Sequence, residues 1–399
     1  MDFTMNISRR LNMMLPIGQS AFLWGARKTG KSTYLSEHYP EAVYYDLLKT
    51  DEYARLLASP HLLREELNAI DSSKMQFPVI IDEIQKIPQL LNEVHWLIEH
   101  KHIGFILCGS SARKLKRGAA NLLGGRAWRF NFYPLIYKEI PNFDLLRALN
   151  QGLLPSHYLS DQFTRMLRAY VNDYLTEEIQ AEGMVRNLPA FARFMELVGF
   201  TNGQMLNYAN IARDCGVDAK TVKEYYQILN DTLIGYLIYP FHKKIKRELI
   251  QATPKFYLFD VGVANYLKRR EIKLLKGDQA GEAFEQFILM ELMAFHGLHE
   301  LDLPIQYWRS KNGFEVDFIL DNGQIAIEVK LSPTPDVSDI KGLRTYCDDY
   351  KPSYAIVVCQ TTRKRVIECD NGVVISILPW QDFLENLWNG HYGMLQTQC

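Results

Sequence analysis

The sequence predicts an α/β protein, and two observations support this fold class. Between residues 20 and 135, short apolar runs alternate with segments of helical spacing; the runs cover residues 20–24, 42–48, 79–81 and 103–108. From about residue 278 onward, a helical segment precedes apolar runs and a further strand–helix alternation. Strands that alternate with helices in this way favour a parallel sheet with helices on both faces.

The same pattern divides the chain into four predicted parts. They are an α/β domain at 1–140, a helical part at 141–200, a third part at 201–262 and a second α/β domain at 263–399. In the third part, helical segments at 209–215 and 219–230 flank a short turn, and apolar runs at 236–241 and 255–259 follow. Two helices followed by two strands are typical of a winged helix.

Composition excludes several classes of protein. The 399 residues are 47% apolar and 23% charged, which is ordinary for a globular chain with a buried core. The net charge of −1 gives no sign of a polyanionic partner, so local charge decides that question. The six cysteines form no C-x-x-C pair, which argues against a zinc site and a disulfide framework. No apolar run is long enough to span a membrane, and we expect a cytoplasmic protein.

A glycine-rich motif follows the first apolar run. Residues 25–32 fit G-x-x-x-x-G-K-[ST] without a mismatch, in the strand-to-helix context that this phosphate-binding loop requires. Loop amides and the helix dipole favour phosphate oxygens. We expect Lys31 to reach the β- and γ-phosphates of ATP and Ser32 to hold Mg²⁺. The predicted nucleotide-binding residues are Gly25, Ala26, Arg27, Lys28, Thr29, Gly30, Lys31, Ser32 and Thr33.

An acidic pair ends the third apolar run. Asp82 and Glu83 come directly after residues 78–81, about 50 residues beyond the glycine-rich loop. Ligands of open α/β sheets bind at the carboxyl ends of the strands. We therefore expect Asp82 to join the Mg²⁺ shell and Glu83 to act as the general base that polarises the attacking water.

Two serines end the fourth apolar run. Ser110 and Ser111 follow a strand that is expected to lie beside the strand of the phosphate loop. Either hydroxyl could then contact the γ-phosphate or the water, although small polar residues are also common in turns. Ser111 is included among the predicted catalytic residues.

These motifs, followed by Gly125-Arg126, resemble AAA+ ATPases. They are most similar to a widespread bacterial and archaeal group of uncharacterised ATPases with an AAA domain, a winged helix and a C-terminal nuclease-like domain. The resemblance covers most of the chain and implies a homo-oligomer in which an arginine completes the neighbouring subunit's site. Arg126 is the predicted finger, with Arg113 as the alternative. That group often carries Gly-Gly-x-Pro in its helical lid, and residues 152–155 keep only part of this element.

Basic residues accompany the predicted winged helix. They are Lys220 and Lys223 in the second helix, and Lys243, Lys244, Lys246 and Arg247 at the expected wing. A basic wing beside a helix–turn–helix is typical of DNA binding. The alternative is a protein-binding winged helix with a solvated charge run, because an acidic residue and three tyrosines interrupt the basic surface.

A predicted hairpin brings carboxylates together near the C-terminus. Apolar runs at 314–320 and 325–331 flank Asn322-Gly323, a strong hairpin signal. A two-residue turn there places Asp317 opposite Glu328 and pairs 315 with 330. One face would be polar, with residues 315, 317, 328 and 330, and the other apolar, with residues 316, 318, 327 and 329. Because opposed carboxylates repel each other, a divalent cation such as Mg²⁺ is the expected compensator.

This constellation resembles the PD-(D/E)XK nuclease superfamily. The resemblance implies that Asp317 is the metal aspartate and that Glu328 and Lys330 form its E-x-K element. It also implies an upstream helical glutamate, which is Glu285 or, alternatively, Glu282. The competing interpretation is a charged, solvent-facing hairpin in which Lys330 neutralises the carboxylates.

The sequence as a whole predicts an oligomeric ATPase that couples ATP and Mg²⁺ binding to DNA engagement. The alternative is a signalling or assembly switch, in which the later domains bind protein. A third possibility makes nuclease action the main output. DNA-stimulated ATP turnover separates the first two, because the switch predicts none.

Overall fold

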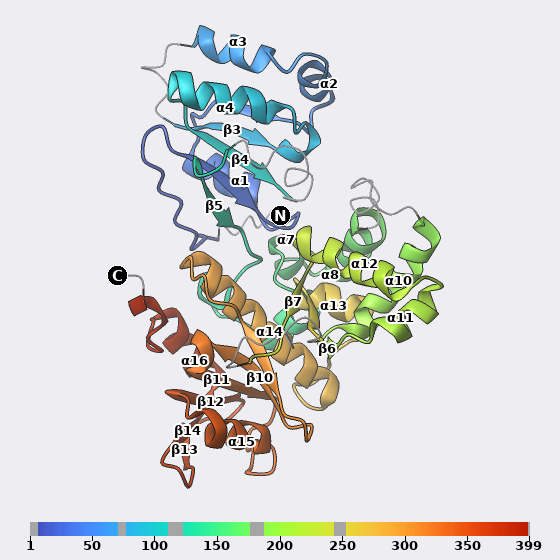
Figure 1. The fold of residues 1–399 in the computed structure, drawn as a ribbon, viewed down its shortest axis with the longest axis vertical. Helices are drawn as coiled ribbons and strands as arrows, with labels where there is room; N and C mark the ends of the chain where they lie inside the picture. Colours follow the sequence, from blue (N-terminus) through green and yellow to red (C-terminus); the bar gives the residue numbers. More distant parts are fainter. Residues whose placement is uncertain (1–6, 71–76, 111–122, 176–186, 243–252, 398–399) are drawn as a thin grey trace. The chain divides into compact units, whose positions relative to one another are not determined.

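The structure is a computed structural model that describes residues 7–70, 77–110, 123–175, 187–242 and 253–397 (Figure 1). The chain forms two compact units. The first comprises residues 1–135 and 228–234, and the second comprises residues 136–227 and 235–399. The predicted Ser111, Arg113, Lys243, Lys244, Lys246 and Arg247 lie outside the described residues.

The first unit contains a five-stranded parallel sheet. Its strands are β1 (Ser20–Trp24), β2 (Tyr44–Asp46), β3 (Val79–Asp82), β4 (Phe105–Gly109) and β5 (Ala127–Asn131), in the order β2-β3-β4-β1-β5. Each neighbouring pair is parallel, so every strand presents its carboxyl end at one edge. This confirms the predicted α/β class and places β4 beside β1. The strand β5 was not predicted from the sequence.

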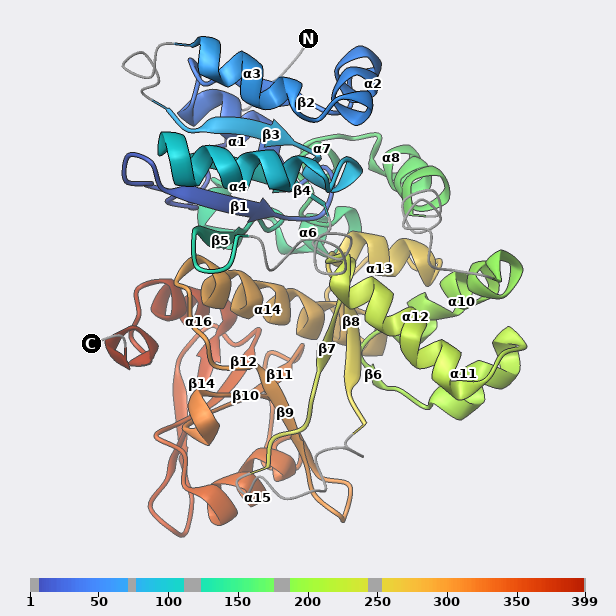
Figure 2. The same ribbon diagram turned by 45° about the horizontal axis from the view of Figure 1, so that its top comes forward.

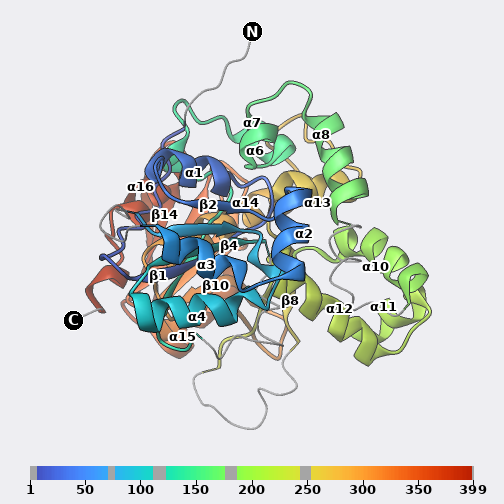
Figure 3. The same ribbon diagram turned by 90° about the horizontal axis from the view of Figure 1, so that it is seen from above.

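Helices cover both faces of this sheet. They are α1 (Lys31–His38), α2 (Thr50–Ala58), α3 (Leu62–Ala69) and α4 (Leu90–Lys101). Figure 3 shows α1 and α4 on opposite faces. Leucines of α2, α3 and α4 pack with the apolar side chains of β1, β3 and β4 in one buried cluster. This core fixes the strand ends from which the functional side chains project.

The second unit begins with a helical segment. It comprises α6 (Leu145–Gln151), α7 (Pro155–Tyr158), α8 (Phe163–Ala169), the π-helix Tyr170–Leu175 and α10 (Leu188–Thr201). Residues 152–154 connect α6 to α7 and surround the buried Asp260, which caps α13 (Val261–Leu267). Asp260 accepts from the amide of Leu153 at 2.6 Å and from that of Val263 at 3.0 Å. A Cβ on Gly152 would collide with this carboxylate, so glycine is required there. The partial Gly-x-x-Pro element thus binds a carboxylate of its own chain.

Two helices and three short strands follow. They are β6 (Gln204–Met205), α11 (Tyr208–Cys215), α12 (Ala219–Asp231), β7 (Gly235–Ile238) and β8 (Lys255–Leu258). The strands form an antiparallel sheet in the order β6-β8-β7. Gly216 ends α11 in the left-handed conformation, and Asp218 accepts from the Thr221 amide at the start of α12. The helices and both predicted strands therefore occur close to their expected positions.

A mixed sheet of six strands forms the C-terminal part. The strands are β9 (Gln306–Arg309), β10 (Glu315–Leu320), β11 (Ile325–Lys330), β12 (Tyr354–Cys359), β13 (Arg365–Glu368) and β14 (Val374–Pro379), in the order β13-β14-β12-β11-β10-β9. Its helices are α14 (Asp278–Leu298), α15 (Lys341–Tyr350) and α16 (Trp380–Trp388). Figure 2 shows α15 on the opposite face from α14 and α16. Both β10 and β11 are therefore interior strands of a covered sheet.

The hairpin between β10 and β11 has the predicted register near its turn. Leu320 pairs with Ile325, and Asn322 and Gly323 both adopt positive φ, at 52° and 94°. The Gln324 amide donates to the Asp321 carbonyl at 3.0 Å, as a type I′ turn requires.

The predicted division of this hairpin into a polar and an apolar face is wrong. The pairing of β10 with β9 shifts register between Val316 and Ile319. As a result Val316 joins Ile319 and Ala326 in one core cluster, whereas the prediction grouped it with Phe318 and Ile327. Nearly all residues of both strands are buried, because helices cover both faces of the sheet. Asp317 and Glu328 consequently lie inside the protein, whereas Glu315 is half-buried.

Candidate functional site

The glycine-rich loop connects β1 to α1 at the carboxyl edge of the first sheet. Lys28 and Gly30 adopt positive φ, at 61° and 101°, and Gly30 forms the N-cap of α1. A Cβ on Gly25 would collide with the carbonyl of Phe132, so the loop can follow this path only with glycine there. Arg9, which sequence reasoning missed, donates to the Thr29 carbonyl at 2.7 Å and supports the loop from outside.

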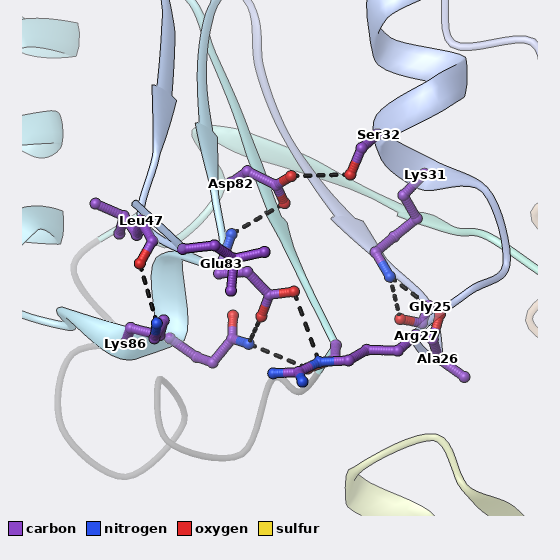
Figure 4. Close-up of polar contacts among 12 residues, drawn as sticks. Gly25, Ala26, Arg27, Lys31, Ser32, Leu47, Asp82, Glu83 and Lys86 are labelled. Carbon is purple, nitrogen blue, oxygen red and sulfur yellow. Dashed lines mark hydrogen bonds and ion pairs between the residues drawn. The ribbon is translucent and has the colours of Figure 1, made fainter. Parts of the chain in front are cut away.

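Lys31 bonds uncharged partners within this loop. Its ammonium donates to the carbonyl of Gly25 at 2.6 Å and to that of Ala26 at 3.1 Å (Figure 4). The side chain is buried, with 6% of its surface exposed. Since both partners are neutral, the charge of Lys31 is not balanced by either hydrogen bond. The geometry suits a residue that exchanges carbonyl oxygens for phosphate oxygens.

Ser32 and Asp82 meet as the sequence predicts. The Ser32 hydroxyl donates to Asp82 Oδ2 at 2.9 Å, across the gap between α1 and β3 (Figure 4). Tyr44 on β2 donates to the same oxygen at 2.6 Å, a contact that sequence reasoning missed. Hydroxyl and carboxylate oxygens are the donors that Mg²⁺ prefers, so these side chains fit the ion that accompanies a nucleotide.

Glu83 lies beside them in a constrained conformation. Its φ is 59°, which a non-glycine residue adopts only at an energetic cost. Gln85 Nε2 donates to the Glu83 carboxylate and, at 3.1 Å, to the Ser110 hydroxyl. Arg27 Nε lies 3.9 Å from the other carboxylate oxygen. Gln85 therefore links the predicted base to the serine at the end of β4, a role that the sequence did not indicate.

Arg126 is remote from the phosphate loop of its own chain. It precedes β5, whose first residue, Ala127, pairs with Ser20 at the start of β1. The loop follows the other end of β1, so Arg126 lies at the opposite edge of the sheet. Its guanidinium pairs with Glu99, whose pKa it lowers. A role as a finger is therefore possible only toward a second subunit.

The second unit gathers the predicted nuclease-like residues. Asp317 and Glu328 are buried, with 8% and 5% of their surfaces exposed, and Asp317 Oδ2 accepts from the Val329 amide at 2.8 Å. In addition to burial, the charge of Asp317 helps to raise the pKa of Glu285 of α14, and the charge of Glu285 helps to raise the pKa of Glu328. The alternative, Glu282, pairs instead with Lys268 and Arg270. Of the two candidates, the structure thus brings Glu285 into the cluster.

Lysines and a tyrosine complete this carboxylate cluster. Lys330 Nζ lies 2.7 Å from Glu328 Oε1. Two residues of β8 were not predicted: Lys255 pairs with Glu315 and lies 3.7 Å from Glu285, and Tyr257 donates to Glu285 at 2.5 Å. Residues i and i+2 of a strand share a face. The sequence signal that could have identified them is a single lysine, Lys255, two positions before a tyrosine, Tyr257, in an otherwise apolar strand.

Burial controls the electrostatics of the cluster. It raises the pKa of Glu285 to about 7, with the charge of Asp317 adding to the effect and Lys255 opposing it. Burial also raises the pKa of Glu328 well above its usual range, where Asp317 again adds to the effect. Glu328 Oε2 is buried and has no hydrogen-bond partner among the described residues. No group of three or more His, Cys, Asp or Glu side chains in the described ranges is arranged to hold a metal ion.

Only two of the predicted DNA-contacting residues lie among the residues that the structure describes. Lys220 and Lys223 are exposed in the first half of α12. The four basic residues of the predicted wing lie outside the described residues. Within the described part of the chain, no helix is long and apolar enough to cross a membrane.

Models of three known families match successive parts of the chain. Residues 18–141 match the family model described as an AAA domain. Residues 142–274 and 280–382 match two further models, each described as a domain of unknown function. The AAA-domain model covers the phosphate loop and the five-stranded parallel sheet, and this similarity agrees with the sequence resemblance.

Three uncharacterized proteins are similar to this chain over most of its length. Uncharacterized proteins of Mycobacterium bovis and Mycobacterium tuberculosis are each 25% identical over 342 residues, which covers 82% of this chain and 74% of theirs. An uncharacterized protein of Methanocaldococcus jannaschii is 22% identical over 385 residues, covering 86% and 82%.

Two solved structures show weak likeness. The Aeropyrum pernix ORC1 protein in complex with DNA has a TM-score of 0.28 at 13% identity, covering 64% of this chain and 87% of that one. A STAND protein with a tetratricopeptide repeat sensor from Pyrococcus horikoshii has a TM-score of 0.21 at 10% identity, covering 70% and 45%. Both scores are too low to support an argument about fold or function.

Proposed function

We propose that the first unit binds and hydrolyses ATP. The observation that carries this proposal is the arrangement of Lys31, Ser32 and Asp82 around the loop at the carboxyl edge of the parallel sheet. Lys31 is held by two backbone carbonyls, and Ser32 and Asp82 lie 2.9 Å apart on facing elements. These side chains can engage a triphosphate without first breaking a bond to an opposite charge.

The proposed reaction assigns one role to each residue. Lys31 exchanges the Gly25 and Ala26 carbonyls for β- and γ-phosphate oxygens, and the loop amides donate to the remaining oxygens. Mg²⁺, when bound with the nucleotide beside Ser32 and Asp82, neutralises phosphate charge. Glu83 accepts a proton as the water oxygen bonds to the γ-phosphorus and ADP departs. Gln85 holds the Glu83 carboxylate and the Ser110 hydroxyl in place.

We infer that ATP turnover is coupled to DNA binding through the predicted winged helix. The exposed Lys220 and Lys223 support this proposal, together with the basic sequence at 243–247. The rival is an assembly switch whose later domains bind protein. Oligomerisation with Arg126 as the finger is part of both proposals, because its place at the far edge of the sheet suits action on a neighbour.

The deciding experiment measures ATP turnover by the full chain with and without duplex, single-stranded and branched DNA. Stimulation by any form supports coupling to DNA. Turnover that DNA does not change, with an oligomeric state that depends on nucleotide, supports the switch. A chain that binds no nucleotide would refute the ATPase proposal.

Nuclease chemistry at the carboxylate cluster stays a prediction from the sequence. It requires a divalent cation among Glu285, Asp317 and Glu328, with Lys330 positioning or activating water. The buried Glu328 Oε2, which has no hydrogen-bond partner among the described residues, is an oxygen that such a cation could take, but the lysines paired with these carboxylates oppose it.

A further inference from the structure

The charges of the carboxylate cluster are already paired within the chain. Lys255 is buried, with 5% of its surface exposed, and pairs with Glu315 while lying 3.7 Å from Glu285. Lys330 pairs with Glu328 at 2.7 Å. Arg309 lies 3.1 Å from the second oxygen of Glu315. Each of these carboxylates, apart from Asp317, thus has a cation of the chain as a direct partner.

The cluster in this arrangement does not fit a divalent cation. Mg²⁺ needs near-octahedral oxygen ligands with free lone pairs. Glu285 Oε1 accepts from Tyr257 at 2.5 Å, Asp317 Oδ2 from the Val329 amide, and Glu328 Oε1 from Lys330, so each carboxylate has one oxygen engaged and the charge of the lysines is the stronger obstacle. The double positive charge of the ion would also be repelled by the lysine ammonium groups a few ångströms away, and this repulsion is strongest where water is excluded. This agrees with the lack of a metal-binding group among the described side chains.

We infer that Lys255 is the resident cation of this cluster and that it keeps divalent metal ions out. The side chain comes from β8, a strand of the three-stranded sheet and not of the β9–β14 sheet that carries Asp317 and Glu328. Tyr257 of the same strand holds Glu285 toward this ammonium. The inference is independent of ATP hydrolysis, and it implies that the predicted nuclease reaction needs Lys255 to leave.

The test compares Mn²⁺ binding to the full chain with and without Lys255. Asp82→Asn is included in every variant, so that the phosphate-loop site does not contribute. The parent should bind no Mn²⁺ at the cluster in calorimetry or electron paramagnetic resonance. Lys255→Met should gain one site per chain with a Kd below about 1 mM, and adding Asp317→Asn should remove it.

Matched control variants distinguish the effect of removing the Lys255 charge from a general effect of substitution on folding. Lys255→Arg keeps the charge and should stay metal-free, whereas Lys273→Met removes an exposed lysine and should behave as the parent. Should Lys255→Met fail to fold, Lys255→Met with Glu315→Gln removes a carboxylate that has lost its lysine partner and preserves the other three. Mn²⁺ should then raise the melting temperature of this variant and leave that of the parent unchanged.

Two outcomes overturn the inference. One is a parent that binds a single Mn²⁺ which Asp317→Asn abolishes, since Lys255 would then not exclude the ion. The other is a folded Lys255→Met variant, or its Glu315→Gln companion, that gains no site. Cleavage of plasmid and branched DNA is measured in parallel. If Lys255→Met binds the metal ion but cleaves no DNA, the inference is supported and the predicted nuclease reaction is refuted.

Discussion

The phosphate loop and the carboxylate cluster both place lysines beside acidic residues, but they balance these charges differently. In the loop, Lys31 bonds two neutral carbonyls, and Asp82 accepts from two hydroxyl groups. In the cluster, Lys255 and Lys330 bond carboxylates directly. In the loop the buried Lys31 and Asp82 each bond neutral groups, whereas in the cluster the lysines and carboxylates form ion pairs with each other.

This difference teaches how to tell a ligand site from a self-neutralised one. Neutral partners are exchanged for a charged ligand at little cost, and the unbalanced charge of Lys31 then stabilises phosphate. A buried ion pair resists such exchange, because removing either partner leaves an uncompensated charge. We therefore expect ligand binding to dominate the effects of mutations in the loop, and folding stability to dominate those in the cluster.

The largest effect is expected from Lys31→Ala. Loss of the cation that meets the γ-phosphate should remove nucleotide binding or lower kcat by about 10²-fold or more. Stability of the ligand-free chain should change little, since only bonds to neutral carbonyls are removed. Fluorescent-nucleotide titration and phosphate release measure the first effect, and urea unfolding measures the second. Lys101→Ala, an exposed lysine at the end of α4, is the control. Normal turnover by Lys31→Ala would refute the site.

Glu83→Gln should separate binding from chemistry. The new amide oxygen can still accept from Gln85, so the geometry is retained, but the amide cannot take a proton from water. We expect ATP to bind with near-parental affinity while turnover falls by about 10²–10⁴-fold. Single-turnover kinetics with bound ATP measures this step. A variant that turns over at the parental rate would show that another group is the base.

Lys330→Met should test the other half of the comparison. Glu328 would lose its cation in a buried site, and we expect a loss of up to about 3 kcal/mol in the free energy of unfolding. Adding Glu328→Gln removes the orphaned charge and should restore most of that loss. ATP turnover should be unchanged in both variants. A double-mutant cycle by urea unfolding gives the coupling, and additive effects of the two changes would contradict the ion pair.

Asp260 offers a buried carboxylate that bonds only neutral groups. Burial raises its pKa to about 6, although the amides of Leu153 and Val263 oppose the shift. Because the folded state then holds the proton more tightly than the unfolded state, its contribution to stability is complete below about pH 4. That contribution falls as pH rises toward 6. Asp260→Asn should be less stable, since it sets an NH₂ group against amide donors. The difference in melting temperature between Asp260→Asn and the parent should become smaller as pH rises from about 4 to 6.

The sequence could predict those features that depend on neighbouring residues. The strand β1, the loop that follows it and the meeting of Ser32 with Asp82 all depend on an apolar run ended by a local motif. The register at Leu320 and Ile325 similarly depends on Asn322-Gly323, whose positive φ angles select one turn. In each case the decisive physical constraint lies within a few residues of the element that it shapes.

The remaining features depend on packing between distant segments. The strand β5 has an edge position and mostly exposed or half-buried side chains, so it lacks the apolar pattern of the others. The register shift at Val316 arises from pairing with β9, and it moves Val316 to the face opposite the one that strict alternation predicts. Lys255 reaches Glu315 across 60 residues of sequence. No local pattern identifies that pairing, although it determines whether the cluster can accept a metal ion.

The smallest expected effect concerns DNA and sharpens the contrast between paired and unpaired lysines. Lys220 and Lys223 are exposed, so their charges are available to phosphates, unlike that of Lys255. Replacing both with alanine should weaken DNA binding several-fold and lower the log–log salt slope by about one unit for each lysine–phosphate interaction that is removed. Replacing Lys243, Lys244, Lys246 and Arg247 together should lower it further. Fluorescence anisotropy over a range of salt concentrations measures the slope, and Lys273→Ala serves as the exposed control. A parental slope in both variants would place DNA binding elsewhere or remove it, and would favour the assembly switch.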